Sequence, residues 1–130
     1  MARAEVRNMA EKSMKKFGQM LREKRVAKGF SLRKFAEQVK VSPTYLSQVE
    51  QSNVDPPTAE RVRRMAELLG ENPDEWIALA GRVPEDLSEM IQSRPTELPD
   101  LVREASGLTA EQIRQLTEQV KRIKEGEREQ

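Results

Sequence analysis

The sequence contains neither cysteine nor histidine. Without cysteine there are no disulfides, no thiolate zinc sites and no cysteine-ligated iron–sulfur clusters, and without histidine the commonest acid–base group near neutral pH is missing. Asp and Glu remain as the main acid–base groups, and none of them stands in a recognisable paired arrangement. These absences predict a protein without catalytic activity, cofactor or metal.

Aromatic residues and long apolar segments are also scarce. Phe, Trp and Tyr make up 4% of the chain, and its apolar runs are only a few residues long. A helix needs roughly 20 mostly apolar residues to cross a bilayer, and no apolar stretch follows the basic N-terminus as a secretory signal would require. We therefore expect a cytoplasmic protein that does not contact a membrane. A chain of 130 residues suits one compact domain with an appendage, without a large internal ligand cavity.

What the sequence does contain is charge, and it is distributed unevenly. Charged residues make up 35% of the chain, although the net charge is only +1. Residues 1–70 hold 15 Lys and Arg against 8 Asp and Glu, whereas residues 71–130 hold 8 against 14. A basic half beside an acidic half indicates that the first half meets a polyanion while the second faces solvent or another protein. The alternative is that Lys and Arg only keep helix surfaces soluble, and charge alone does not decide between the two.

Apolar residues recur at spacings of three and four almost throughout, and no segment alternates as a strand would, which predicts an all-α fold. In the first 81 residues this periodicity indicates five helices. The first carries Phe17, Met20, Leu21 and Val26 and ends at Gly29. The other four begin after polar residues that cap helix N-termini, namely Ser31, Ser42, Thr58 and Asn72.

Beyond residue 81 the chain is predicted to form a short helical extension. Three prolines separate two short helical pieces, and Thr109 with Gln112 forms a capping box for a last helix. That helix carries apolar residues at spacings of three, four and three, which we call the C-terminal stripe: Ile113, Leu116, Val120 and Ile123. Such a stripe joins two copies, binds a partner or folds back on its own protomer, because a monomer must otherwise expose it.

The most informative segment is LRKFAEQVKVSPTYLSQVEQ, residues 32–51. Its apolar residues, with small Ala36 near the crossing point, suit two short helices packed at a steep angle: Phe35, Val39, Val41, Leu46 and Val49. Once these are buried, the later of the two helices exposes short polar or neutral side chains instead of the long charged ones usual on a solvated face: Pro43, Thr44, Ser47, Gln48 and Gln51. Side chains of this kind can reach base edges in the major groove of DNA.

This segment closely resembles the helix-turn-helix of the XRE family, the Cro-type phage-repressor domains. The resemblance extends from about Phe17 to Ala80, and the run VSPTYLSQVE is its most specific part. It implies a five-helix phage-repressor-like bundle in which the helix at 43–51 lies in the major groove. The residues that it places against the bases are Pro43, Thr44, Ser47 and Gln48.

The resemblance also implies residues that contact the DNA backbone or hold the domain together. Phosphate contacts are implied at three places in the five-helix bundle. These are the start of the second helix, the loop after the third helix and the fourth helix, with the residues Arg33, Lys34, Gln51, Ser52, Asn53 and Arg61. Arg25 and Glu50 match an ion pair that links the first and third helices in many members. The sequence departs from the family pattern at Lys40 and Ser52, where Gly is common, and a left-handed conformation at Lys costs about 1 kcal/mol.

For single residues, alternatives remain. Gln48 suits paired hydrogen bonds to N6 and N7 of adenine. Thr44 and Ser47 contact either bases or phosphate and water, and Pro43 either touches a base or only begins the helix. Within residues 1–16, five Lys and Arg are interrupted by two Glu, so this stretch is either an arm along DNA or a solvated helix face.

These observations predict four regions: a basic helical extension at 1–16, a DNA-binding domain at 17–81, a helical extension at 82–125 for dimerisation or partner binding, and a polar tail at 126–130. The chain is expected to be a sequence-specific transcriptional regulator, a repressor, that binds a palindromic operator of double-stranded DNA as a homodimer. The alternative is an antitoxin-like protein whose C-terminal half binds another polypeptide while the helix-turn-helix regulates its own operon. An adaptor that uses the bundle only for protein contacts is a third interpretation.

Overall fold

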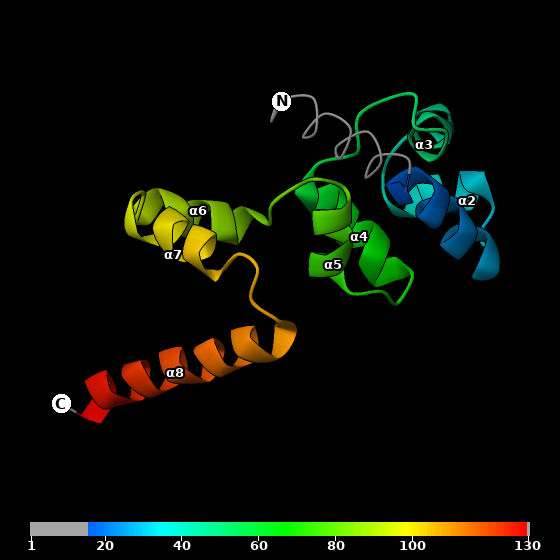
Figure 1. Ribbon diagram of the computed structural model, residues 1–130. Coiled ribbons are helices and arrows are strands. Elements are labelled where there is room, and N and C mark those ends of the chain that lie inside the picture. Colours follow the sequence, from blue (N-terminus) through cyan, green and yellow to red (C-terminus); the bar gives the residue numbers. More distant parts are fainter. Residues whose placement is uncertain (1–15, 130) are drawn as a thin grey trace. The chain divides into compact units, whose positions relative to one another are not determined.

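The computed structural model describes residues 16–129, with side chains to residue 127, and its regular elements are helices (Figure 1). A helix over residues 16–27 comes first, followed by α2 (Leu32–Gln38), α3 (Pro43–Glu50), α4 (Ala59–Leu68), α5 (Pro73–Leu79), α6 (Glu85–Ser93), α7 (Glu97–Ala105) and α8 (Ala110–Glu129). No strand occurs among the described residues, so the predicted all-α class is confirmed. None of the helices in this range is both long and apolar enough to span a membrane. Apart from Lys16, the predicted basic extension lies outside the described residues.

The chain divides into two compact units, Met1–Ser88 and Glu89–Gln130. The first unit therefore continues past residue 81, where the sequence analysis ends the DNA-binding domain. Directly after residue 81, Arg82 donates from Nε to the carbonyl of Pro57 at 3.1 Å and from Nη2 to the carbonyl of Pro56 at 2.6 Å. These bonds attach the segment after α5 to the loop between α3 and α4.

The core of the first unit contains apolar side chains from its first five helices: Phe17, Leu21, Phe35, Ala36, Val39, Leu46, Val49, Val62, Met65, Ala66, Leu69, Trp76, Ile77 and Ala80. The rings of Phe17 and Trp76 meet edge to face, with centroids 6.0 Å apart. The predicted inward position of Val26 is wrong, because its side chain is 59% exposed. Arg25 takes that position instead, since it continues the spacing of four that Phe17 and Leu21 begin.

The predicted helix starts in this unit are confirmed. The side-chain oxygens of Ser31 and Ser42 accept hydrogen bonds from the backbone N–H three residues later at 3.1 and 3.0 Å, and those of Thr58 and Asn72 do the same at 3.5 and 3.0 Å. Lys40 ends the turn after α2 with a φ of 60°, the left-handed conformation that the family more often gives to Gly. These local features fix where α3 begins and which of its sides faces the core.

In the second unit no described residue is buried, yet the last helix begins at a capped residue. Thr109 and Gln112 exchange hydrogen bonds of 3.0 and 3.1 Å, which confirms the capping box at the start of α8. α8 continues to Glu129, so residues 126–129 of the expected polar tail extend the helix, and Gln130 lies outside the described residues. Glu and Arg are good helix formers. Because this end of the helix carries no apolar residue, its side chains can stay in water and the helix needs no packing partner there.

Candidate nucleic-acid interface

α3 turns one side to the core and the other to solvent. Leu46 and Val49 are buried beneath the helix. The four residues predicted to face bases lie on its solvent side, the first two exposed and the last two partly exposed: Pro43, Thr44, Ser47 and Gln48. None of the four carries a charge. This side of α3 therefore offers hydrogen-bonding groups that can exchange water for base edges without the cost of burying a charge.

The polar side chains along α3 differ in how they are engaged. Gln51 donates from Nε2 to Ser47 Oγ at 2.9 Å, and Asn53 donates from Nδ2 to Gln51 Oε1 at 3.2 Å. Gln48 makes no side-chain hydrogen bond with any described residue, so both its amide nitrogen and its carbonyl oxygen are available. Ser47 keeps its own hydroxyl hydrogen to donate. Gln48 is thus the residue best prepared to make two hydrogen bonds to one base.

The structure brings Arg25 and Glu50 together beneath this helix. Arg25 donates from Nε to Glu50 Oε2 at 2.7 Å and from Nη2 to Oε1 at 3.0 Å, and its Nη1 donates to the carbonyl of Phe30 at 2.9 Å. The two side chains are only 10% and 5% exposed. Two parallel hydrogen bonds between guanidinium and carboxylate restrict both distance and orientation. The last turn of α3 is therefore tied to the helix over residues 16–27.

Gly18 provides a second close contact between the same two helices, and the sequence analysis did not identify it. A Cβ at this position would lie 2.6 Å from the carbonyl oxygen of Val49, 2.8 Å from that of Glu50 and 2.9 Å from Ser52 Oγ. Contacts with backbone oxygens below 3.0 Å are far inside normal van der Waals separation. Only Gly fits here, and its lack of a side chain sets how closely the end of α3 approaches the first helix.

The residues predicted to contact phosphate lie around α3. Arg33 and Lys34 are exposed in the first turn of α2 and form no ion pair with any described residue. In the loop after α3, Gln51 and Asn53 are exposed and joined by their hydrogen bond, while Ser52 is half-buried with a φ of 61°. The left-handed residue turns the chain sharply away from α3 directly after its C-terminus.

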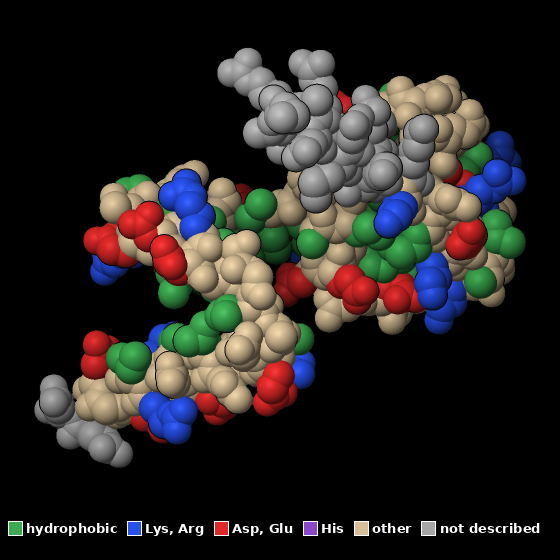
Figure 2. All heavy atoms as spheres, viewed as in Figure 1, with side chains coloured by type: hydrophobic (Ala, Val, Ile, Leu, Met, Phe, Trp, Pro, Cys, Tyr) green, Lys and Arg blue, Asp and Glu red, His purple; other side chains and the backbone are tan. Residues whose placement is uncertain are grey.

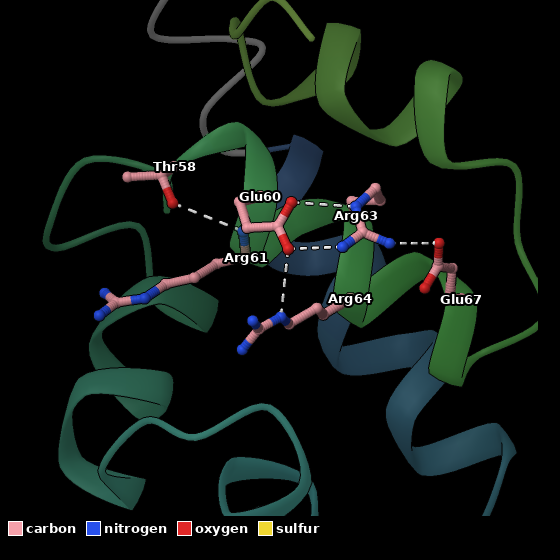
Figure 3. Close-up of polar contacts among 6 residues, drawn as sticks. All are labelled: Thr58, Glu60, Arg61, Arg63, Arg64 and Glu67. Carbon is pink, nitrogen blue, oxygen red and sulfur yellow. Dashed lines mark hydrogen bonds and ion pairs between the residues drawn. The ribbon is translucent and has the colours of Figure 1, made fainter. Parts of the chain in front are cut away.

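Figure 3 separates the three arginines of α4 by what they contact. Arg63 donates to Glu60 Oε2 at 3.0 Å and to Glu67 Oε1 at 2.6 Å, and Arg64 lies 3.4 Å from Glu60. Arg61 points away from this cluster, with its guanidinium carbon 5.8 Å from the centre of the Tyr45 ring. It forms no ion pair with any described residue. Of the three, Arg61 alone keeps an uncompensated charge next to α3.

The charged groups of this cluster shift one another's pKa values. Hydrogen bonds from Arg63 are the main reason that the pKa of Glu60 lies below its usual value; desolvation opposes them, and the charges of Arg63 and Arg64 add to the lowering. The two carboxylates in turn raise the pKa of Arg63. Both groups are exposed, so the cluster adds little to stability. Its consequence is that Arg63 is neutralised locally and Arg61 is not.

Arg22 is another residue that the sequence analysis did not select. It lines a hollow of about 220 Å³ together with Ser47 of α3 and Gln51, the residue directly after α3, between the first helix and α2. Arg22 is exposed and forms no ion pair with any described residue. The hollow adjoins the side of α3 that carries the predicted base contacts. No local signal in the sequence distinguishes Arg22 from the other cations of its helix.

The predicted C-terminal stripe belongs to the second unit. Ile113, Val120 and Ile123 are 40%, 46% and 65% exposed, and Leu116 is partly exposed. The structure thus leaves the stripe mostly uncovered.

Comparisons with known proteins agree with the predicted resemblance. A model of the family described as helix-turn-helix matches residues 21–76. The crystal structure of the clp gene regulator ClgR from Corynebacterium glutamicum is 26% identical over 72% of this chain and 94% of its own, with a TM-score of 0.47. A second crystal structure of ClgR is 30% identical over 53% of this chain and 88% of its own, with a TM-score of 0.45. A structure of a SinR protein/SinI protein complex is 26% identical over 84% and 98%, with a TM-score of 0.44. No curated protein sequence matches the chain.

Proposed function

The chain belongs to the helix-turn-helix family of XRE-type DNA-binding transcriptional regulators, and we propose that it is a sequence-specific repressor that places α3 in the major groove of double-stranded DNA. The observation that carries this proposal is the uncharged solvent side of α3, on a helix held in place by the buried Arg25–Glu50 pair. Short polar side chains on a rigid helix distinguish base edges, whereas a charged surface binds any polyanion. The protein then works where the DNA is, in the cytoplasm.

Base reading is assigned first to Gln48. Its side-chain amide can donate to N7 of adenine while its side-chain carbonyl accepts from N6, and this pair of hydrogen bonds distinguishes adenine from the other bases. Thr44 and Ser47 have shorter reach and contact neighbouring bases or phosphate. Pro43 presents its ring at the first turn, where it either meets a thymine methyl group or only begins the helix.

Binding strength and register come from contacts to phosphate. Arg33, Lys34 and Arg61 supply cations that no described carboxylate neutralises. The loop residues Gln51, Ser52 and Asn53 supply polar groups just past α3, and Arg22 adds a cation beside Ser47. Such contacts orient the protein on the duplex and carry no sequence information themselves. They release condensed counterions, so binding falls steeply as salt rises.

A homodimer on a palindromic operator completes the proposal. One short recognition helix reads only a few base pairs, too few for a unique genomic site, and a twofold axis doubles the site. The exposed C-terminal stripe supports this assignment because it supplies apolar surface for a second copy. A dimer that covers a promoter blocks transcription, which is the basis for assigning repression rather than activation.

The test begins with selection of bound fragments from a random DNA pool, followed by binding of variants to selected and scrambled duplexes at several salt concentrations. Gln48→Ala should weaken binding to the selected site by about 1–3 kcal/mol and relax preference at one base position, with little change on scrambled DNA. Arg33→Ala should instead weaken both and lower the salt slope by about one. An equal loss on both duplexes from Gln48→Ala contradicts its base-reading role.

The second candidate function is an antitoxin-like regulator whose C-terminal half binds another polypeptide. The exposed C-terminal stripe of α8 favours it too, together with Leu101 and Val102 of α7, which are 53% and 61% exposed. The two functions differ in what the purified protein does alone: a repressor that dimerises through this surface is a dimer in solution, whereas an antitoxin-like protein keeps the surface open until its partner is added.

A further inference from the structure

The loop between α3 and α4, residues 51–58, is held by backbone hydrogen bonds only at its ends. At its start, the N–H groups of Ser52 and Asn53 donate back into α3 at 3.0 and 2.9 Å, and at its end Thr58 caps α4. In between, residues 54–57 form no hydrogen bond with the backbone of any other described residue. The middle of this α3–α4 loop therefore depends on side-chain contacts for its position.

Two consecutive prolines restrict what those contacts can be. Pro56 and Pro57 have no N–H, so their carbonyls are the only backbone groups with which they can form hydrogen bonds. Both carbonyls accept from Arg82, that of Pro57 from Nε at 3.1 Å and that of Pro56 from Nη2 at 2.6 Å. In Figure 1 the α3–α4 loop and the segment after α5 meet beside the start of α4. One guanidinium thus holds two successive residues of the loop.

Arg82 is itself attached to the core. Its N–H donates to the carbonyl of Ile77 at 3.0 Å, and the N–H of Gly81 donates to the carbonyl of Ala78 at 2.9 Å. With Gly81 at a φ of 72°, these bonds form the Schellman motif that ends many helices. The Ile77 side chain is buried in the core. The end of α5 therefore determines where the middle of the α3–α4 loop lies.

The α3–α4 loop has no positive charge with which to attract DNA. Gln51, Ser52 and Asn53 are uncharged, and Asp55 is the only charged residue of the loop. The cations assigned to phosphate lie on other elements, and Figure 2 shows Lys and Arg side chains over α2. Hydrogen bonds from neutral groups weaken steeply when distance or angle is wrong. A mobile loop would also lose conformational entropy on binding, so these contacts need a loop that is already in place.

We propose that Arg82 is a positioning residue for DNA binding, which holds the α3–α4 loop in the conformation that contacts phosphate without touching DNA itself. The proposal rests on the phosphate contacts that the proposed function assigns to this loop. Arg82 lies beyond residues 21–76, which the family model matches. A residue of the segment that leads to the second unit thus takes part in binding by the helix-turn-helix.

Salt dependence separates positioning from direct contact. Arg82→Ala should weaken binding of the full chain to the selected duplex about threefold to tenfold, since losing a hydrogen bond changes an equilibrium by roughly that factor. The slope of log affinity against log salt should stay unchanged, because the uncharged loop contacts release no counterions. A slope lowered by about 0.9 would mean that Arg82 itself binds phosphate, which overturns the proposal.

Arg94→Ala is the matched control. It removes the same charge from an exposed arginine whose side chain donates only to the carbonyl of Ser93, at 3.4 Å, and it should change neither affinity nor slope. A loss from Arg94→Ala as large as that from Arg82→Ala would attribute both effects to net charge and would overturn the positioning role. Urea denaturation followed by Trp76 fluorescence confirms that each variant is folded in the binding assay.

Arg82→Lys keeps the charge and replaces two donor nitrogens in a rigid fork by one. We expect this variant to lose most of the affinity that Arg82→Ala loses. Native affinity with Lys would show that only the charge matters, contrary to the proposal.

A double-mutant cycle tests whether Arg82 acts through the loop. Arg82→Ala should weaken binding less when Asn53→Ala is already present, because the contact that Arg82 positions is then missing. Combined with Arg33→Ala in α2, the two losses should add. Additive losses with Asn53→Ala overturn the positioning role and leave the proposed function intact. If neither Arg33→Ala nor Gln48→Ala affects DNA binding, the proposed function itself fails, and this inference fails with it.

Discussion

At the scale of single residues, Glu50 illustrates how strongly the domain depends on a buried charge pair. Removing one partner of such a pair leaves the other charge buried and uncompensated, at a cost of about 3–5 kcal/mol. We expect Glu50→Ala to lower the free energy of unfolding by about this amount, a large share of the roughly 5–15 kcal/mol of a typical domain. Urea denaturation followed by the fluorescence of Trp76, the only tryptophan and part of the core, measures it.

Glu67→Ala is the matched control for this measurement. Glu67 also pairs with an arginine, but its side chain is 52% exposed, and exposed pairs contribute about 0–1 kcal/mol. Similar losses from Glu50→Ala and Glu67→Ala would show that the pair beneath α3 does not carry the weight assigned to it.

Gly18 leads to a prediction that opposes helix propensity. In an open helix position, Gly→Ala stabilises by about 1 kcal/mol. At Gly18 the added methyl group would meet backbone oxygens at 2.6 and 2.8 Å, so α3 or the first helix must shift. We expect Gly18→Ala to lower the free energy of unfolding by about 1–3 kcal/mol, as overpacking usually does. The shift of the Trp76 urea transition measures this change.

Gly126→Ala makes the same substitution in α8, where nothing lies within 4 Å of the new methyl group. It should increase helix content slightly by circular dichroism and leave the Trp76 transition where it was. A Gly18→Ala variant as stable as the native chain would mean that the two helices do not approach as closely as the structure indicates.

At the scale of one element, α4 distinguishes a phosphate contact from a structural arginine. Arg61 is uncompensated and Arg63 is held by Glu60 and Glu67 (Figure 3). We expect Arg61→Ala to weaken binding to selected and scrambled DNA alike and to lower the slope of log affinity against log salt by about 0.9. Arg63→Ala removes the same formal charge from the same helix and should leave the slope almost unchanged. A larger effect from Arg63→Ala would reverse the assignment.

At the scale of the whole molecule, the proposed homodimer makes a geometric demand on its operator. Two recognition helices related by a twofold axis read half-sites about 34 Å apart, which corresponds to centres about 10 base pairs apart. Inserting about five base pairs between the half-sites moves them to opposite faces of the duplex and should reduce affinity to that of one half-site. Electrophoretic mobility of the full chain on both duplexes measures the change. Unchanged affinity after the insertion would show that the two half-sites are not read together.

Much of the fold and part of the interface were predictable because their causes are local. The caps at Ser31 and Ser42 act over three residues, and helical periodicity acts over four, so both can be read along the chain. Together they determine where α3 begins and which of its residues face solvent. The extent of α8 was predicted less well, because a polar sequence can equally extend a helix or fray from its end.

The sequence by itself thus determined the all-α class, the helix starts and the uncharged side of α3. The family resemblance had indicated that Arg25 meets Glu50. The tertiary structure alone decided the other contacts between distant elements: that Gly18 lies against the end of α3, and that Arg22 lies beside Ser47. The physical reason is that these contacts join residues about 25 or more positions apart in the chain, whose separation depends on how helices pack and not on any local preference. The exposure of the C-terminal stripe has the same origin, because only the packed structure shows what each helix leaves uncovered.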